Sequence, residues 1–149
     1  MPAGLLLPMA DIPAVPPPPS PEPLDVLLVD DDVDITRLMT LYLTKFGYAV
    51  APANDGQAAL KIIRQRRVAL VVTDILMPQV DGYELIMKLR QIPGRPQIVA
   101  TSGNPARFGM NFLKSAQQMG ADRLLPKPFL PQDLLAMVRE LIGPRTAAA

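Results

Sequence analysis

The sequence predicts an α/β fold in which five parallel strands form a doubly wound sheet. Two observations support this fold class: five short apolar segments recur along the chain, and an amphipathic stretch with helical spacing follows each of them. A third observation is size, because 149 residues, 49% of them hydrophobic, suffice for one domain with a proper core. Strands that alternate with helices form a parallel sheet covered on both faces.

Each strand is predicted from a short apolar run that ends at a polar or turn residue. The expected strands are 26–29, 48–51, 69–72, 97–100 and 123–125. The second, Tyr48-Ala49-Val50-Ala51, has the weakest pattern. Right-handed crossovers restrict the topology, and the flavodoxin-like strand order 2-1-3-4-5 suits five strand-helix units.

Helices are predicted where apolar residues recur every three or four positions. They are expected over 35–46, around 59–63, over 82–90, near 110–119 and over 131–142. Gly47 is expected to cap the first helix at its C-terminus, and Asp32 or Asp34 can cap its N-terminus. Pro131 suits the first position of the last helix, although Leu130 before it is a poor N-cap.

Proline content separates the first 23 residues from the rest of the chain. Half of the 18 prolines precede Leu24, including the run Pro16–Pro19. Such a segment lacks backbone donors and favours polyproline II, so residues 1–23 are predicted to be a disordered or semi-stiff tail. The alternative is a docking peptide for a groove that binds proline-rich segments. Residues 24–143 are expected to form one domain with no second domain, and residues 144–149 a short C-terminal tail.

Composition narrows the possible chemistry. The net charge of +1 gives no electrostatic reason to expect nucleic acid or a membrane as a partner. Cysteine and histidine are both absent, so reactions must use carboxylates, hydroxyls, lysine and the backbone. The start of the chain does not resemble a signal peptide, and no apolar run approaches the roughly 20 residues of a membrane span. A cytoplasmic protein is therefore expected.

Polar residues follow the predicted strands, where parallel sheets bind their ligands. Asp30, Asp31 and Asp32 follow the first strand, and Asp74 follows the third. Because these strands are neighbours in the expected order, their carboxylates should converge and require a compensating cation. An all-oxygen cluster suits Mg²⁺ or Mn²⁺. For Asp32 and Asp34 the structural interpretation, as turn or capping residues, is preferred.

Lys127, after the fifth strand, adds a cation to this edge. A phosphoryl group on a carboxylate carries about two negative charges, and Lys127 can neutralise them on the side away from a metal. Ser102 offers a hydroxyl for a phosphoryl oxygen, and Gly103 leaves space beside it. Carboxylates are known nucleophiles that form acyl phosphates. The sequence therefore predicts phosphoryl transfer onto Asp74.

From about Leu24 to Gly143 the chain closely resembles the receiver domains of two-component response regulators. The matching residues are Val29-Asp30-Asp31, Asp74 with Met77-Pro78 and Asp81-Gly82, Ser102-Gly103, and Lys127-Pro128-Phe129. All four motifs in this order are highly specific, whereas any one of them is weak.

The resemblance implies a role for each matching residue. Asp74 would be phosphorylated; Asp31, Asp74 and the backbone carbonyl of Leu76 would bind the metal directly, and Asp30 would bind it through water. Lys127 would be the family's lysine, with a cis peptide bond to Pro128. Ser102 would be its hydroxyl residue, with Thr101 as the alternative.

Two features depart from the family pattern. Leu124 occupies the position three residues before the lysine, where the family often has an aromatic residue that reports phosphorylation. Residues 104–110 form a longer loop than usual, interpreted as a tolerated surface insertion or a partner-contact loop.

Because the chain has no histidine, the donor is expected to be a phosphohistidine on a sensor histidine kinase or histidine phosphotransfer protein, or a small acyl phosphate. The domain would not be a turnover enzyme but would signal to an unknown downstream protein by binding, as a phosphorelay or chemotaxis-type module. One alternative is a receiver-like interaction module that is never phosphorylated. A haloacid-dehalogenase-like phosphatase is a second, but that class needs another aspartate two residues after the nucleophile, where this chain has Leu76.

Overall fold

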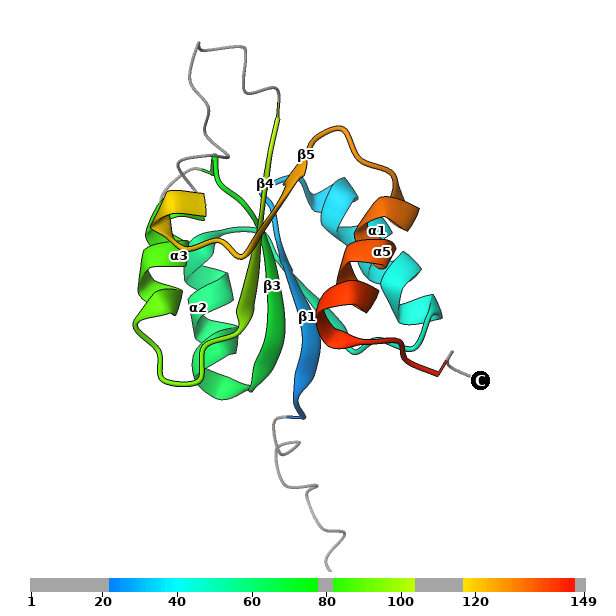
Figure 1. Ribbon diagram of the computed structural model, residues 1–149, viewed down its shortest axis with the longest axis horizontal. Helices are drawn as coiled ribbons and strands as arrows, with labels where there is room; N and C mark the ends of the chain where they lie inside the picture. Colours follow the sequence, from blue (N-terminus) through cyan, green and yellow to red (C-terminus); the bar gives the residue numbers. More distant parts are fainter. Residues whose placement is uncertain (1–21, 78–81, 104–116, 147–149) are drawn as a thin grey trace, which may run out of the picture.

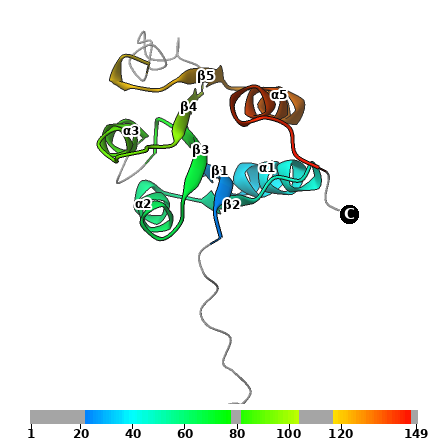
Figure 2. The same cartoon turned by 60° about the horizontal axis from the view of Figure 1, so that its bottom comes forward.

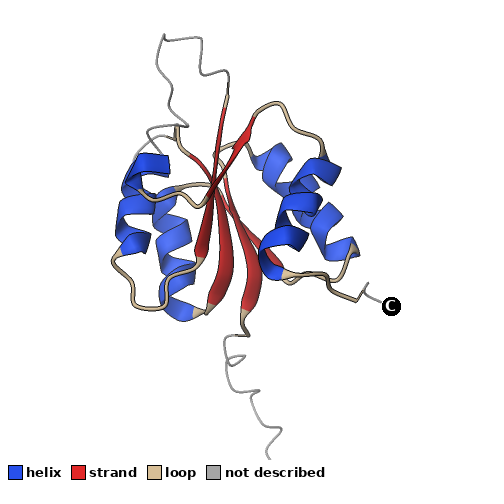
Figure 3. Cartoon of the chain, viewed as in Figure 1, coloured by secondary structure: helices blue, strands red, loops and turns tan. Residues whose placement is uncertain are grey.

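A five-stranded parallel sheet lies at the centre of the molecule, between two layers of helices (Figures 1 and 3). The computed structural model describes residues 22–77, 82–103 and 117–146. The strands are β1 (Leu24–Val29), β2 (Val50–Ala53), β3 (Val68–Asp74), β4 (Gln97–Ser102) and β5 (Arg123–Pro126). Their order is β2-β1-β3-β4-β5 and all neighbouring pairs are parallel, which confirms the predicted fold class and strand order.

Helices cover both faces of the sheet. They are α1 (Val33–Lys45), α2 (Gly56–Gln65), α3 (Gly82–Arg90) and α5 (Pro131–Ile142). Viewed along the sheet, α1 and α5 lie on one face, and α2 and α3 lie on the other (Figure 2). Residues 117–119 are helical, but the rest of the helix predicted near 110–119 lies outside the described residues. Residues 1–21 of the proposed tail 1–23 and the loop 104–110 also lie outside them, so the domain limits at 24 and 143 stay predictions.

Two apolar clusters hold the helices to the sheet. Leu27, Val71 and Ile98 pack beneath α2 and α3, whereas Val26, Leu70 and Val99 pack beneath α1 and α5. Alternate residues of the same strands thus enter opposite clusters, as expected for a parallel sheet buried on both faces. This explains why the strands read as continuous apolar runs rather than as alternating polar and apolar residues.

The second strand begins two residues later than predicted. Tyr48 is only 2% exposed and packs in the cluster beneath α1 and α5, and its hydroxyl donates to the Gly143 carbonyl at 2.7 Å. The N–H of Ala49 donates to the Asp25 carboxylate at 2.7 Å. Contacts with distant residues therefore hold positions 48 and 49, and the strand extends to Ala53. Pro52 is tolerated because β2 is an edge strand.

The ends of α1 and α5 largely follow the sequence prediction. The Asp32 carboxylate accepts the N–H groups of Asp34 and Ile35 at 3.0 and 3.2 Å, which confirms Asp32 as the N-cap of α1. The C-cap is Phe46, one residue earlier than predicted, and Gly47 follows with a φ of 94°. Pro131 opens α5, and the Leu130 N–H is satisfied by the Asp133 carboxylate at 2.9 Å.

Within the described residues, no helix combines the length and the apolar character that crossing a membrane requires.

Candidate functional site

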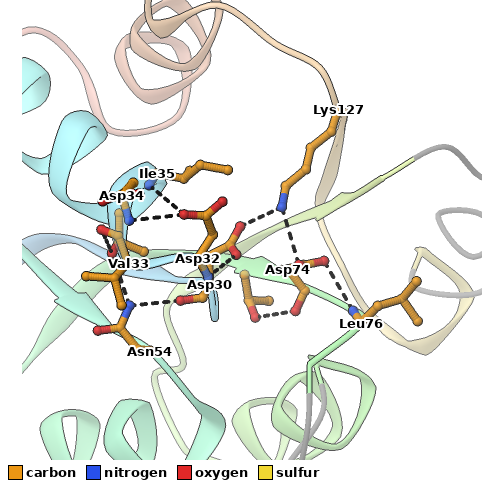
Figure 4. A network of polar contacts seen from close by, with 11 residues as sticks. Asp30, Asp32, Val33, Asp34, Ile35, Asn54, Asp74, Leu76 and Lys127 are labelled. Carbon is orange, nitrogen blue, oxygen red and sulfur yellow. Dashed lines mark hydrogen bonds and ion pairs between the residues drawn. The ribbon is translucent and has the colours of Figure 1, made fainter.

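The carboxyl edge of the sheet brings together polar residues from four strands. Asp30 directly follows β1, Asp74 ends β3, Ser102 ends β4, and Lys127 directly follows β5. The register pairs Val29 with Thr73, so the residues that follow them, Asp30 and Asp74, are neighbours. Figure 4 shows both carboxylates pointing toward the Lys127 ammonium group. The convergence expected from the strand order is therefore present.

Three carboxylates form the acidic part of this site. Asp30, Asp31 and Asp74 each offer an oxygen atom, and these atoms all lie within 4.8 Å of one another. Asp30 and Asp74 are each 6% exposed, whereas Asp31 lies at the surface. Oxygen donors from few carboxylates, open to water on one side, match the preference of Mg²⁺. The donor set thus fits the metal that the sequence predicts.

Lys127 links the two buried carboxylates. Its Nζ lies 2.6 Å from Asp30 Oδ2 and 3.3 Å from Asp74 Oδ2. Its backbone N–H donates to the Ser102 carbonyl at 2.9 Å, which fixes the start of the loop to β4, and its peptide bond to Pro128 is cis. Burial by itself lowers the pKa of Lys127, but the hydrogen bond with Asp30 and the charges of Asp74 and Asp30 outweigh it and raise that pKa. The ammonium group is therefore held in its charged form.

The carboxylates themselves carry more negative charge than one lysine neutralises. Burial raises the pKa of Asp74, although Lys127 and the Leu76 N–H, which donates at 3.2 Å, oppose the shift. The pKa of Asp31 is raised by partial burial, by its hydrogen bond with Asp30 and by repulsion from that residue. A cation bound among the three would relieve this cost and keep them ionised.

The two candidate hydroxyl residues lie on opposite faces of β4. Ser102 is fully buried and shares its face with Ile98 and Ala100, which pack beneath α2 and α3. Its Oγ has no hydrogen-bond partner among the described residues. Thr101 shares its face with Val99, which packs beneath α1 and α5. An unpaired buried hydroxyl is costly, and that cost supports Ser102 as the hydroxyl residue, which stays a prediction.

Asn54 is a supporting residue that the sequence analysis does not identify. Its side-chain amide donates to the Asp30 carbonyl at 3.0 Å and to the Thr36 hydroxyl at 3.1 Å (Figure 4). It therefore ties the loop that carries the aspartates to the start of α1. Its position after β2, at the same edge as the other site residues, is the pattern that would have identified it.

Gly82 lets the first turn of α3 approach the end of β3. Its N–H donates to the Ile75 carbonyl at 3.2 Å, and an added Cβ would lie 2.1 Å from the Asp74 carbonyl oxygen. Only glycine fits this contact. The neighbouring motif residues Pro78 and Asp81 lie outside the described residues.

Leu124 occupies the position of the family's aromatic residue. It is half-buried and packs against the apolar cluster beneath α2 and α3, on the same side of the sheet as Ser102.

Comparisons with known proteins agree with this fold and identify the family. Residues 26–139 match the model of the response regulator receiver domain. A probable transcriptional regulator, ycf27, of Cyanophora paradoxa is 36% identical over 117 residues, which are 78% of this chain and 47% of that protein. The response regulator MprA of Mycolicibacterium vanbaalenii is 37% identical over 121 residues, 80% of this chain and 51% of that protein. The chain thus spans about half the length of these curated relatives.

Solved structures show the same architecture. A putative response regulator from Chloroflexus aurantiacus aligns with a TM-score of 0.71 and 30% identity, covering 80% of this chain and 97% of that one. The chemotaxis protein CheY4 of Vibrio cholerae aligns with a TM-score of 0.70 and 25% identity, covering 80% and 99%. The family model matches most of the chain, similar proteins are found among both curated sequences and solved structures, and the acidic cluster lies at the carboxyl edge of the sheet, as expected. This chain therefore belongs to the receiver domain family of two-component response regulators.

Proposed function

We propose that Asp74 accepts a phosphoryl group from a phosphohistidine on a partner protein, either a sensor histidine kinase or a histidine phosphotransfer protein. One observation carries the proposal: the buried Asp74 carboxylate lies 3.3 Å from the Lys127 ammonium, among oxygens of Asp30 and Asp31 within 4.8 Å. None of the 149 residues is a histidine, so the proposed phosphohistidine lies outside this sequence.

In the transfer, an Asp74 carboxylate oxygen attacks phosphorus in line with the bond to the donor imidazole. A P–O bond forms, the P–N bond breaks, and its electron pair stays on the imidazole nitrogen. Lys127 is already charged and hydrogen-bonded at the site, so it can neutralise the phosphoryl oxygens without reorganising. The unpaired Ser102 hydroxyl would then donate to a phosphoryl oxygen.

A Mg²⁺ or Mn²⁺ ion held by Asp31, Asp74 and the Leu76 carbonyl, with Asp30 acting through water, would supply further positive charge to the transferring group. Asn54 and the Asp32 cap keep the aspartate loop in place, so the cluster does not have to assemble during the reaction.

The phosphorylated form would signal by binding a protein, as a phosphorelay or chemotaxis-type module, and hydrolysis of the aspartyl phosphate would reset it. This makes the domain an acceptor that turns over its own phosphoryl group rather than an enzyme for general substrates. The ycf27 and MprA relatives each have about half their length beyond the match, and no function of that half is assigned to this chain.

The test is incubation of the full chain with Mg²⁺ and acetyl phosphate, followed by intact-mass measurement. The expected result is the addition of one phosphoryl group, lost in Asp74→Asn. Asp32→Asn is the matched control, because Asp32 caps α1 outside the acidic cluster and asparagine caps equally well. A mass gain that persists in Asp74→Asn would refute the site, and no gain in the unmodified chain would favour the interaction module. Continuous turnover of phosphate monoesters would favour the phosphatase.

A further inference from the structure

A cavity lies at the opposite, amino-terminal edge of the sheet, where β1, β3 and β4 begin. It is formed by the start of β1, the turn between α2 and β3, and the segment between α3 and β4. Its volume is about 840 Å³, which falls within the roughly 300–1,000 Å³ of small-molecule sites. None of the residues assigned to phosphoryl transfer lines it.

Arginine dominates the charge of this cavity. Arg64, Arg66, Arg67 and Arg95 line it, together with one acidic residue, Asp25. The Asp25 carboxylate is already used, because it accepts the Ala49 N–H at 2.7 Å and pairs with Arg145 at 3.1 Å.

The four arginines differ in how far their charge is compensated. Arg95 binds both oxygens of Asp122, at 3.0 and 3.1 Å, and so is neutralised. Arg66 donates through Nε to the Glu22 carbonyl at 2.7 Å, which positions its guanidinium without cancelling the charge. Across the described part of the chain, neither Arg66 nor the exposed Arg64 and Arg67 pairs with a carboxylate. Three positive charges therefore lie uncompensated along one wall.

The remaining lining residues are mostly apolar, with Gln65 and Gln97 as polar exceptions. Val68 and Pro96 are buried, and Ile63 and Ile92 are half-buried. A ligand that binds both the arginines and the apolar residues needs several negative charges, which the guanidinium groups can bind in bidentate fashion. It also needs a flat, weakly polar group that can lie against the apolar residues. We propose that this cavity binds a nucleoside polyphosphate, with its phosphates on Arg64, Arg66 and Arg67 and its base on the apolar lining.

The distribution of charge favours a small ligand over a long polyanion. The chain as a whole has a net charge of only +1, so it lacks the broad positive field that nucleic acids require. The excess charge is instead confined to the short segment 64–67 on a concave surface. The site is also independent of the proposed phosphorylation, because it lies at the other end of β3 from Asp74.

The test is calorimetric titration of the full chain with ATP, in EDTA so that the acidic cluster plays no part. We expect a Kd below about 1 mM, weakened by at least about tenfold in Arg64→Ala/Arg67→Ala. Both side chains are exposed and pair with no carboxylate of the described residues, so this variant should melt at the temperature of the unmodified chain. Arg37→Ala/Lys45→Ala removes the same charge from exposed positions of α1 and should bind ATP normally. Arg64→Lys/Arg67→Lys keeps the positive charge but removes the planar guanidinium groups and their bidentate hydrogen bonds. This variant should bind ATP more weakly than the unmodified chain.

Three results would overturn the proposal. One is the absence of ATP binding at millimolar concentration. Another is an equal loss of binding in the two alanine double variants, which would mean that only total charge matters. The third is a preference for another class of ligand. An equal affinity for inorganic triphosphate and ATP would mean that the apolar lining does not select a base, and a higher affinity for single-stranded DNA would mean that the site binds a long polyanion.

Discussion

Substitution of Gly82 by alanine would test the close contact that supports Asp74. An alanine Cβ would lie 2.1 Å from the Asp74 carbonyl oxygen, 2.3 Å from Ile75 Cα and 2.8 Å from the Asp74 carbonyl carbon. All three are backbone atoms of the last residue of β3, the central strand, or of the residue that follows it, so no side chain can rotate away to make room. Either the start of α3 or the end of β3 must move.

The cost of that movement can be worked out from its parts. Adding a methyl group to a well-packed contact typically costs about 1–3 kcal/mol. The hydrogen bond from the Gly82 N–H to the Ile75 carbonyl, 3.2 Å long, would also be strained, at a cost of roughly 1 kcal/mol. We therefore expect the free energy of unfolding to fall by about 2–4 kcal/mol. Phosphoryl uptake should slow as well, because the displaced backbone carries the acceptor.

Urea denaturation gives the free energy, and intact-mass kinetics with acetyl phosphate give the uptake. The matched control for stability is Gly103→Ala, because a Cβ there meets no atom of the described residues within 4 Å. Its stability should change by less than about 0.5 kcal/mol. If Gly82→Ala stays within the same 0.5 kcal/mol of the unmodified chain, the close contact does not exist as described.

Three further predictions concern charge and hydrogen bonding. Lys127→Met leaves Asp30 and Asp74 without their cation, so the metal-free chain should lose roughly 1–3 kcal/mol of stability. Its Mg²⁺ affinity by calorimetry should nevertheless rise, and an unchanged affinity would contradict the electrostatic account. Asn54→Ala removes a hydrogen bond to the Asp30 carbonyl and one to the Thr36 hydroxyl, and should weaken Mg²⁺ binding by about tenfold, whereas unaltered binding would remove its supporting role. The hydrogen bond from Arg95 lowers the pKa of Asp122 in the folded state, so its stabilisation is present above the unfolded pKa of about 4 and is lost as pH falls through the folded value. Asp122→Asn should flatten the acid side of the stability-pH curve, and a curve with the same slope would refute this assignment.

Much of the fold follows from patterns within short windows of sequence. The helix expected over 82–90 and the start of the last helix at Pro131 are observed where predicted. Glycine, proline and apolar spacing act within one or two turns, so these elements can be identified locally. The predicted start of the second strand is wrong because contacts with distant parts of the chain decide it. Tyr48 is held by Gly143, and Ala49 is held by Asp25.

The sequence by itself determined the family, the strand order, and the residues that meet at the carboxyl edge of the sheet, because strand ends in a parallel sheet are placed by topology. Tertiary structure alone decided that Lys127 lies closer to Asp30 than to Asp74, that Asn54 supports the aspartate loop, and that arginines line a cavity at the far edge. Each of these contacts joins segments far apart in the chain, such as Asp30 and Lys127, 97 positions apart. Distances of that kind depend on how helices and strands pack, and no local pattern of residues encodes them.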